Sequence, residues 1–378
     1  MNAGNASIAK TELTDRPVAV IGAGIAGLVA AIALREQGAR VTVYEQSAEL
    51  SEAGAGIQIA PNAMRLLDRL GPGTTLRAVG VPALGVDLRA GLSGRRLLFS
   101  RFAGDYVFIH RAELIGILAK AATDAGVDVR LNAKQSADEI EADLVVAADG
   151  VHSRHRAALN PTHAPVFSRM VAYRTICQAD GAEPRLARLW TGPGAHLVSY
   201  PLGDSSQVNL VGVCEVETWQ GSGWSTPADL GELAAHFSRF APEVQALIHR
   251  AGPVLRWGLF RAPVASRWQD GRVVLIGDAA HPTLPFLAQG ANMGIEDGWL
   301  LAALLAKHGL QSLPQFETIR QARTSKIVAA ADRNGRIYHA RGLARIGLEI
   351  GIRAVSQLGL IGQPYGWVHD YDAASDVT

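Results

Sequence analysis

Short apolar runs alternate with amphipathic stretches along the first part of the chain. The β-branched run Val18–Ile21 is typical of a buried strand, and Leu28–Gln37, rich in Ala and Leu, is typical of a helix. Gly38 is a natural helix stop, and Arg40–Glu45 has the pattern of a second strand. A strand, a helix and a strand in this order predict a parallel sheet covered by helices.

Strands and helices are also expected to alternate further along the chain. Further strands are expected at Ile57–Ile59, Tyr106–Ile109, Val127–Arg130, Asp143–Ala148 and Arg272–Ile276. Helices are expected at about Pro61–Leu70, His110–Ala125, Gln289–Lys307, Gln315–His339 and Leu343–Leu358. The late strand at residues 272–276 would return to the sheet that the first strands begin.

Between residues 166 and 256 the pattern changes. Strands are expected at Met170–Cys177, Arg188–Thr191, His196–Tyr200 and Val208–Glu215, then helices near Pro227–Phe240 and Pro242–Arg250, then a strand at Trp257–Arg261. We therefore expect an α/β (α+β) fold in which an antiparallel substrate-binding sheet, residues 166–256, is inserted into a Rossmann-like domain of residues 17–165 and 257–340. Residues 1–16 are expected to be a disordered tail, and residues 341–378 a C-terminal helical segment.

Composition narrows the class of protein. Of the 378 residues, 48% are hydrophobic and 19% charged, as is usual for an α/β enzyme, and a net charge of +1 gives no general attraction for nucleic acid or an anionic membrane. No apolar run is long enough to span a bilayer, and residues 1–16 lack the apolar segment of a secretion signal. Cys177 and Cys214 have no metal-ligand spacing, so we expect no metal site and a cytoplasmic protein.

A glycine loop follows the first strand. Gly22 would allow a tight turn, Gly24 would let the backbone approach a pyrophosphate, and Gly27 would let the helix lie close to the sheet. Glu45, at the end of the second strand, is placed to accept hydrogen bonds from ribose hydroxyls. These features favour binding of a dinucleotide with an unphosphorylated ribose, such as FAD or NAD, and the alternative is a glycine-rich turn without a ligand.

Three motifs occur in order along the chain. They are Gly22–Gly27 with Glu45, Asp149-Gly150-Val151-His152-Ser153 with Arg156, and Gly277-Asp278 with His281-Pro282. With these spacings the chain resembles the single-component FAD-dependent aromatic hydroxylases of the p-hydroxybenzoate hydroxylase fold, and most of all their salicylate, 3-hydroxybenzoate and 6-hydroxynicotinate hydroxylase branch. The resemblance covers nearly the whole chain.

That resemblance implies an activity. The expected enzyme is an FAD-dependent monooxygenase that hydroxylates a small phenolic or N-heteroaromatic, carboxylated substrate through a flavin C4a-hydroperoxide, using O2 and NADH or NADPH. We expect a monomer or a homodimer. The resemblance also implies a set of FAD-binding residues, with the Asp149 motif serving NAD(P)H as well: Gly22, Gly24, Ile25, Ala26, Gly27, Glu45, Gln46, Arg111, Asp149, Asp278, Pro285, Gly290, Ala291 and Asn292.

The expected substrate site centres on His196 and Tyr200. A strand periodicity of two places both on one face, together with Val198. The resembling branch has a His and a Tyr at this spacing in its pocket, which implies that His196 is the base and that Tyr200 and Gln289 orient the substrate. The alternative for His196 is a packed histidine with a satisfied hydrogen bond.

Two further positions bear on the substrate. Gln58 and Phe286 are expected to line the pocket, and both stand where some 6-hydroxynicotinate-type enzymes have His, which argues against that substrate. Arg174 is a candidate partner for a carboxylate, although a contact with the surface or the FAD domain is an equal alternative.

The sequence is also compatible with other functions. The same scaffold serves other FAD-dependent oxidoreductases, namely reductases, oxidases and halogenases, and non-catalytic flavin-binding proteins. The Trp-x-Trp-x-Ile-Pro segment of tryptophan-type halogenases is absent from the sequence.

Overall fold

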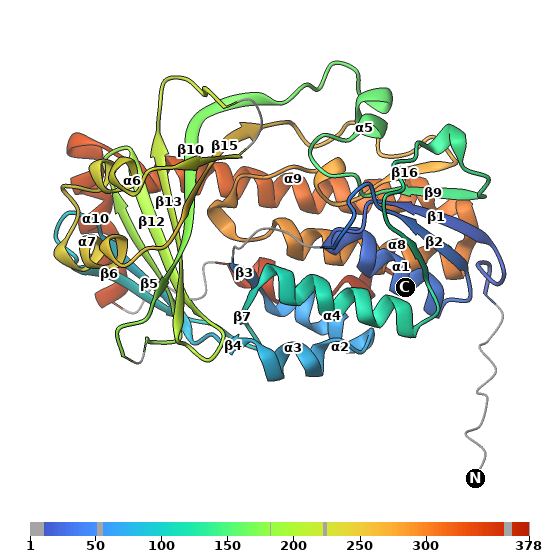
Figure 1. Ribbon diagram of the computed structural model, residues 1–378, viewed down its shortest axis with the longest axis horizontal. Coiled ribbons are helices and arrows are strands. Elements are labelled where there is room, and N and C mark those ends of the chain that lie inside the picture. Colours follow the sequence, from blue (N-terminus) through green and yellow to red (C-terminus); the bar gives the residue numbers. More distant parts are fainter. Residues whose placement is uncertain (1–10, 51–55, 182, 222–224, 359–364, 378) are drawn as a thin grey trace, which may run out of the picture.

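The protein consists of a helix-covered parallel sheet joined side by side to a larger sheet, as the computed structural model shows (Figure 1). The structure describes residues 11–50, 56–181, 183–221, 225–358 and 365–377. The fold class expected from the sequence is confirmed.

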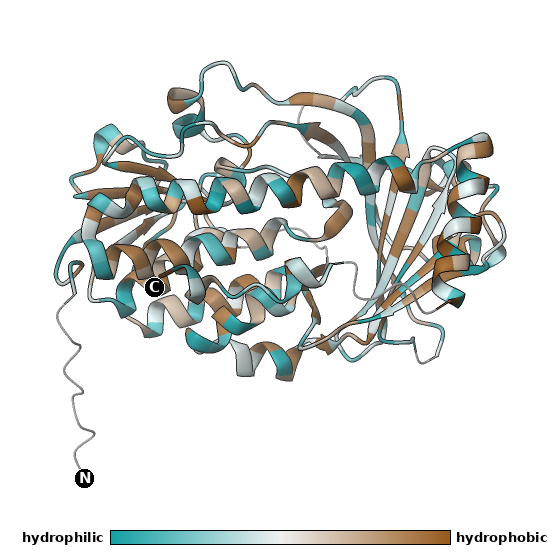
Figure 2. Cartoon of the chain, turned by 180° about the vertical axis from the view of Figure 1, so that it is seen from behind, coloured by the Kyte–Doolittle hydropathy of each residue, from teal (hydrophilic) through white to brown (hydrophobic). Residues whose placement is uncertain are grey.

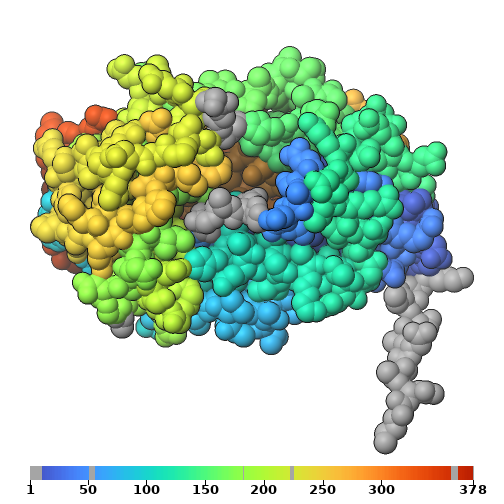
Figure 3. All heavy atoms as spheres, viewed as in Figure 1, coloured from blue at the N-terminus to red at the C-terminus, as the bar shows by residue number. Residues whose placement is uncertain are grey.

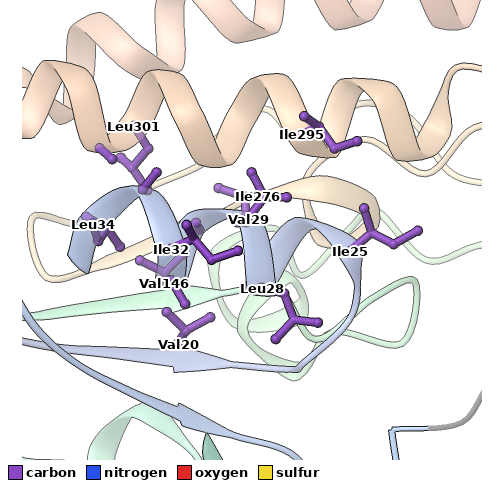
Figure 4. Close-up of a cluster of buried hydrophobic side chains, with 14 of the residues drawn as sticks. Val20, Ile25, Leu28, Val29, Ile32, Leu34, Val146, Ile276, Ile295 and Leu301 are labelled. Atoms are coloured by element: carbon purple, nitrogen blue, oxygen red, sulfur yellow. The ribbon is translucent and has the colours of Figure 1, made fainter. Parts of the chain in front are cut away.

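The parallel sheet is the core of the nucleotide-binding half. Its strand order is β16 (Val273–Leu275), β9 (Leu144–Ala147), β1 (Pro17–Ile21), β2 (Arg40–Tyr44) and β8 (Asp128–Arg130), with every pairing parallel. Helix α1 (Ile25–Glu36) packs between this sheet and α8 (Gly290–His308), and it also contacts α4 (Arg111–Asp124). Apolar side chains of β1, α1, β9 and α8 interdigitate there, so β1 and α1 are held from both sides (Figure 4).

The second sheet has eight strands. Their order is β14 (Ser225–Ala228), β15 (Val254–Arg261), β10 (Val166–Gln178), β13 (Gln207–Glu215), β12 (Ala195–Leu202), β11 (Leu186–Gly192), β5 (Gly85–Ala90) and β6 (Arg96–Arg101). The sheet is mixed rather than antiparallel throughout, because β5 pairs parallel with β11.

Strands β5 and β6 come from residues 85–101, outside the segment 166–256 that the sequence predicts for this sheet. Their hydrophobic pattern is weak for a physical reason. The buried side of β5 carries Gly85 and Asp87, and the Asp87 carboxylate is neutralised by Arg89 and Arg96. An ion pair thus replaces the apolar alternation that marks the other strands.

A small third sheet and the remaining helices complete the molecule. The sheet order is β3 (Gly56–Ile59), β7 (Val107–His110) and β4 (Val81–Pro82). The further helices are α2 (Pro61–Arg69), α3 (Gly73–Val79), α5 (Arg154–Leu159), α6 (Leu230–His236), α7 (Pro242–His249), α9 (Leu313–Tyr338), α10 (Gly342–Gln357) and α11 (Gly366–His369). Helix α9 runs from the parallel sheet to the eight-stranded sheet, and hydrophilic and hydrophobic residues alternate along it (Figure 2).

Two boundaries differ from the sequence-based expectation. The helix expected from Pro227 begins at Leu230, because Ser225–Ala228 form the edge strand β14, where a proline needs no ladder partner, and Asp229 caps the helix. The expected tail 1–16 is ordered over residues 11–16, because the Leu13 side chain is buried in the core of the parallel sheet. Residues 1–10 lie outside the described residues.

No helix in the described part of the chain combines the length and apolar character that crossing a membrane requires.

Candidate active site

A cavity of about 730 Å³ lies between the two halves of the molecule. The carboxyl ends of β1, β2 and β9 open into one end of it, and one face of the eight-stranded sheet forms the other end. The surface is hollowed between these halves (Figure 3). Ligands of open α/β sheets bind at this edge, and the volume is in the usual range for a small-molecule site.

The three glycines of the loop after β1 have distinct surroundings. A Cβ on Gly22, whose φ is +100°, would lie 2.4 Å from the Ala148 carbonyl oxygen, and one on Gly27 would lie 2.0 Å from the Gly22 oxygen. A Cβ on Gly24 would meet no protein atom within 4 Å. The turn and the close helix packing expected for Gly22 and Gly27 are therefore confirmed, and the space beside Gly24 belongs to the cavity.

Glu45 fixes this loop while facing the cavity. Its carboxylate accepts hydrogen bonds from the backbone N–H groups of Ala23 (2.8 Å) and Ser47 (2.9 Å). The carboxylate thereby ties the end of β2 to the glycine turn. Ile25, Ala26 and Gln46 line the cavity beside it.

Charged side chains from distant segments converge on the same end of the cavity. Arg111, Asp149 and Asp278 all line it. Asp149 Oδ2 contacts His155 Nδ1 at 2.8 Å, whereas its buried Oδ1 has no hydrogen-bond partner among the described residues. Asp278 lies in the interior of the molecule, where its side chain is exposed to the cavity. Burial raises the pKa of its carboxyl group, and His281 and Arg111 oppose that shift.

The N-terminus of α8 and the turn before it form part of the cavity wall. Pro285, Gln289, Gly290 and Ala291 line it. The side-chain Oε1 of Gln289 accepts a hydrogen bond from Asn62 Nδ2 (3.1 Å), and the buried Nε2 of Gln289 has no partner among the described residues.

Asn292 does not have the position expected of a cofactor-binding side chain. It lies outside the cavity lining and joins α8 to β3, since its Oδ1 accepts from the Ala60 N–H and its Nδ2 donates to the Gln58 carbonyl. A side-chain amide that bridges two backbone segments is a structural link.

His196 and Tyr200 of β12 lie on one cavity face, as the strand periodicity predicts. Val198 lies between them, and Val211 and Val213 of β13 extend the same apolar wall. Gln58 also lines the cavity, and its Oε1 accepts a hydrogen bond from the hydroxyl of Tyr106.

Both polar residues of this face are buried. Burial lowers the pKa of the His196 imidazole well below its usual value, and the neighbouring His339 adds to that effect. His196 Nδ1 lies 2.7 Å from His339 Nε2. Burial likewise raises the pKa of the Tyr200 hydroxyl, so both side chains are neutral near pH 7.

Phe286 is not part of the cavity wall, in contrast to the expectation. Its ring lies behind His196, with the ring centres 5.3 Å apart, and it packs in an apolar cluster with Met170 and Leu284. The Phe286 ring packs instead against α9, close to Gly335.

Two further residues lie at the site, Arg174, which the sequence offers as a candidate, and His339, which it does not indicate. Arg174 of β10 lines the cavity close to Tyr200. Its guanidinium group lies over the ring of Trp257, 5.5 Å from the centroid. His339 contacts His196 from 143 positions away in sequence, and no local pattern indicates such a pair.

A buried ionic network supports the Gly277-Asp278 turn. Asp297 of α8 accepts from the Gly277 N–H (2.8 Å), contacts His281 Nε2 (2.5 Å) and pairs with Arg320 (2.6 Å). Each of these side chains is fully buried. The sequence identifies His281 only as a structural member of the turn, and its contact with Asp297 agrees with that interpretation.

We expect the stability of the protein to fall in acid because of Asp297. Burial alone would raise the pKa of its carboxyl group, but the contacts with His281 and Arg320 outweigh burial and hold that pKa at about 2, against an ordinary 3.8. A lowered folded-state pKa contributes stability above about pH 4, and that contribution, about 2 kcal/mol, is lost as the pH falls through 2. Denaturant unfolding between pH 6 and 2 measures it. Asp297→Asn should flatten the dependence of the unfolding free energy on pH. The surface variant Asp124→Asn should leave that dependence unchanged. Equal pH dependence in the wild type and both variants would contradict the assignment to Asp297.

Within the described residues, no cluster of His, Cys, Asp or Glu has the geometry of a metal site.

The sequence is similar to known proteins over most of its length. The family described as FAD binding domain matches residues 15–137 and 122–331. A 3-amino-4-hydroxybenzoate 2-monooxygenase of Streptomyces platensis is 36% identical over 86% of this chain and 89% of its own length. A 3-hydroxybenzoate 6-hydroxylase of Aquipseudomonas alcaligenes is 34% identical over 86% of this chain and 90% of its own length.

Solved structures agree on the fold. A salicylate hydroxylase substrate complex superimposes with a TM-score of 0.81 at 23% identity, over 96% of this chain and 97% of the other. A 2,6-dihydroxypyridine-3-hydroxylase from Arthrobacter nicotinovorans has a TM-score of 0.75 at 22% identity, over 87% of this chain and 94% of the other.

Proposed function

We propose a substrate class and residue roles for this chain, which belongs to the FAD-binding monooxygenase family and is an FAD-dependent aromatic hydroxylase. The proposed substrate is a small carboxylated phenol, or an N-heteroaromatic equivalent. The proposed electron donor is NADH or NADPH, and O2 is the second substrate. The observation that carries the proposal is that one continuous cavity joins the glycine loop to the face of His196 and Tyr200.

The residues at the sheet end of this cavity suit FAD. The space beside Gly24 admits a pyrophosphate, and the α8 N-terminus at Gly290 and Ala291 offers backbone N–H groups and a positive dipole end. Asp149, which lines this end, has a buried Oδ1 with no hydrogen-bond partner among the described residues. We propose that Glu45, Arg111 and Asp278 contact the ribose, pyrophosphate and ribityl parts of the cofactor.

The chain's own residues would prepare the substrate. Bound flavin supplies the activated oxygen, which reacts best with an electron-rich ring. We propose that His196 takes the phenolic proton at Nε2, because removing that proton enriches the ring and a neutral imidazole is able to accept it. Tyr200 and Gln289 orient the substrate by hydrogen bonds, and Gln58 completes the wall.

A screen of phenolic acids tests the substrate class. Salicylate, 3-hydroxybenzoate and 3-amino-4-hydroxybenzoate, named after the relatives' substrates, are incubated with the enzyme, O2 and either NADH or NADPH. At least one acid should stimulate oxidation of the nicotinamide and give a product heavier by one oxygen atom. Stimulated oxidation that yields only hydrogen peroxide for every acid would contradict the proposed substrate class.

Arg174 is the proposed partner of the substrate carboxylate. Arg174→Gln should raise the KM for a carboxylated phenol by about 10- to 100-fold, the loss of one charge-assisted hydrogen bond, with a smaller change in kcat. Arg174→Lys should recover part of the affinity. The wild type should bind the carboxamide analogue as weakly as Arg174→Gln binds the acid. Equal KM values for acid and amide in the wild type would contradict this role.

Two further expectations remain proposals. A reducing compartment such as the cytoplasm suits Cys177 and Cys214, which are buried and free. The chain is expected to act as a monomer or a homodimer.

A further inference from the structure

A row of hydrogen-bonded side chains leads from the cavity to the surface. It begins at His196, continues through His339 and ends at Glu215. His196 is 2% exposed and His339 is 5% exposed, whereas the Glu215 side chain is 41% exposed. The row therefore joins a buried ring in the cavity wall to a carboxylate in contact with water.

Backbone contacts hold the three residues in register. Strands β12 and β13 pair beside them, and the Glu215 N–H donates to the Gly194 carbonyl at 2.9 Å. His339 follows the last turn of α9, and its carbonyl accepts from the Gly194 N–H at 3.2 Å. The turn at Gly194 thus holds the backbones of Glu215 and His339 beside each other.

The carboxylate at the outer end determines where each proton lies. Glu215 Oε1 is an acceptor, so His339 Nδ1, at 3.2 Å, must carry a proton. In a neutral ring His339 Nε2 is then an acceptor, so the proton between the rings belongs to His196 Nδ1, 2.7 Å away. His196 Nε2 is consequently left unprotonated, which is the form that a base requires.

The surroundings favour neutral rings. Among the described residues, the ionisable groups that face the row are Tyr338 beside His196, and Glu215 and Arg341 beside His339. Burial lowers the pKa of both imidazoles, and Glu215 partly opposes that effect at His339. Arg341 donates to Glu215 Oε2 at 2.5 Å and so orients this carboxylate.

We propose that His339 and Glu215 form a proton relay that sets His196 as the base and carries the substrate proton to solvent. This rests on the proposed function, in which His196 accepts the phenolic proton. His196 Nε2 gains that proton as His196 Nδ1 passes its own to His339 Nε2. His339 Nδ1 then passes its proton to Glu215, which releases it to water. One proton enters, one leaves, and neither buried ring stays charged.

His339 and Glu215 are thus positioning residues, and Glu215→Gln is the sharpest change to test them. Arg341 offers only donors, so the single amide oxygen of the glutamine is expected to turn toward Arg341 and its N–H2 group toward His339. The protons of both rings then reverse, and His196 Nε2 becomes a donor. Glu217→Gln is the matched control, because Glu217 is an exposed residue two positions along the chain.

Histidine-selective nitrogen-15 NMR of the FAD-loaded protein reads these protons directly. Signals are assigned by their loss in His196→Gln and His339→Gln. The wild type and Glu217→Gln should show both rings protonated at Nδ1, and Glu215→Gln should show both protonated at Nε2. His196 protonated at Nε2 in the wild type, or tautomers unchanged in Glu215→Gln, would overturn the relay.

Rapid-reaction kinetics supply a second readout. Glu215→Gln should slow hydroxylation by about 10²-fold or more, the penalty of a base in the wrong tautomer, with FAD affinity unchanged. Glu217→Gln should hydroxylate at the wild-type rate. If His196→Gln blocks hydroxylation but Glu215→Gln does not, the relay is wrong and the proposed function stands. If His196→Gln hydroxylates normally, the proposed function itself fails.

Discussion

Replacing His196 with Gln is expected to slow oxygen transfer to the substrate by about 10²–10⁴-fold, the usual contribution of a positioned base. The phenolic proton would have no acceptor at the cavity wall, so the ring would remain less electron-rich. Reduction of the bound flavin by NAD(P)H does not require removal of that proton and should change far less. More of the O2 consumed should therefore appear as hydrogen peroxide.

Rapid mixing separates these steps, and Val198→Ala serves as a control on the same cavity face. That variant removes apolar surface but no proton acceptor, so it should weaken substrate binding without uncoupling the reaction. A His196→Gln enzyme that hydroxylates at the wild-type rate with full coupling would show that His196 only packs against His339 and Phe286.

Replacing Gly24 with Val is expected to abolish FAD retention, with a loss of affinity on the order of 10²-fold or more. The backbone at Gly24 has φ −73° and ψ −179°, which valine adopts readily, and its Cβ would meet no protein atom within 4 Å. The protein should therefore fold. The new side chain would instead occupy the space proposed for the pyrophosphate.

The other loop glycines show why Gly24 is the better test. Gly22→Val and Gly27→Val would place a Cβ 2.4 Å and 2.0 Å from backbone oxygens, so the loss of FAD would be confounded by misfolding. Gly116→Val, on an exposed turn of α4 with open space around it, is the control. Equilibrium titration with FAD after removal of the cofactor measures affinity, and circular dichroism checks the fold. Gly24→Val with stoichiometric FAD would contradict the placement.

Much of the fold follows from local pattern. The strand, glycine loop and helix at residues 17–36 obey rules that operate within one turn or one strand, so the sequence predicts them. The period of two likewise places His196 and Tyr200 on one face. The sequence does not predict strands β5 and β6, because Asp87, paired with Arg89 and Arg96, stands where an apolar residue would mark a buried strand face.

The parts of the site that sequence reasoning misses depend on tertiary contacts. His339 meets His196 through the packing of α9 against the eight-stranded sheet, across 143 positions. The direction of Phe286 depends on a short turn, and the role of Asn292 depends on where β3 passes α8. The pattern of residues along the sequence contains no information about these tertiary contacts.

A single turnover under oxygen-18 gas tests the central claim most directly. FAD-loaded enzyme is reduced anaerobically with NADH or NADPH in the presence of the phenolic acid that the screen identifies, then mixed with labelled O2. The account predicts a hydroxylated product that carries one labelled oxygen atom on the ring. Product without the label, or a reduced substrate formed before O2 is admitted, would contradict it.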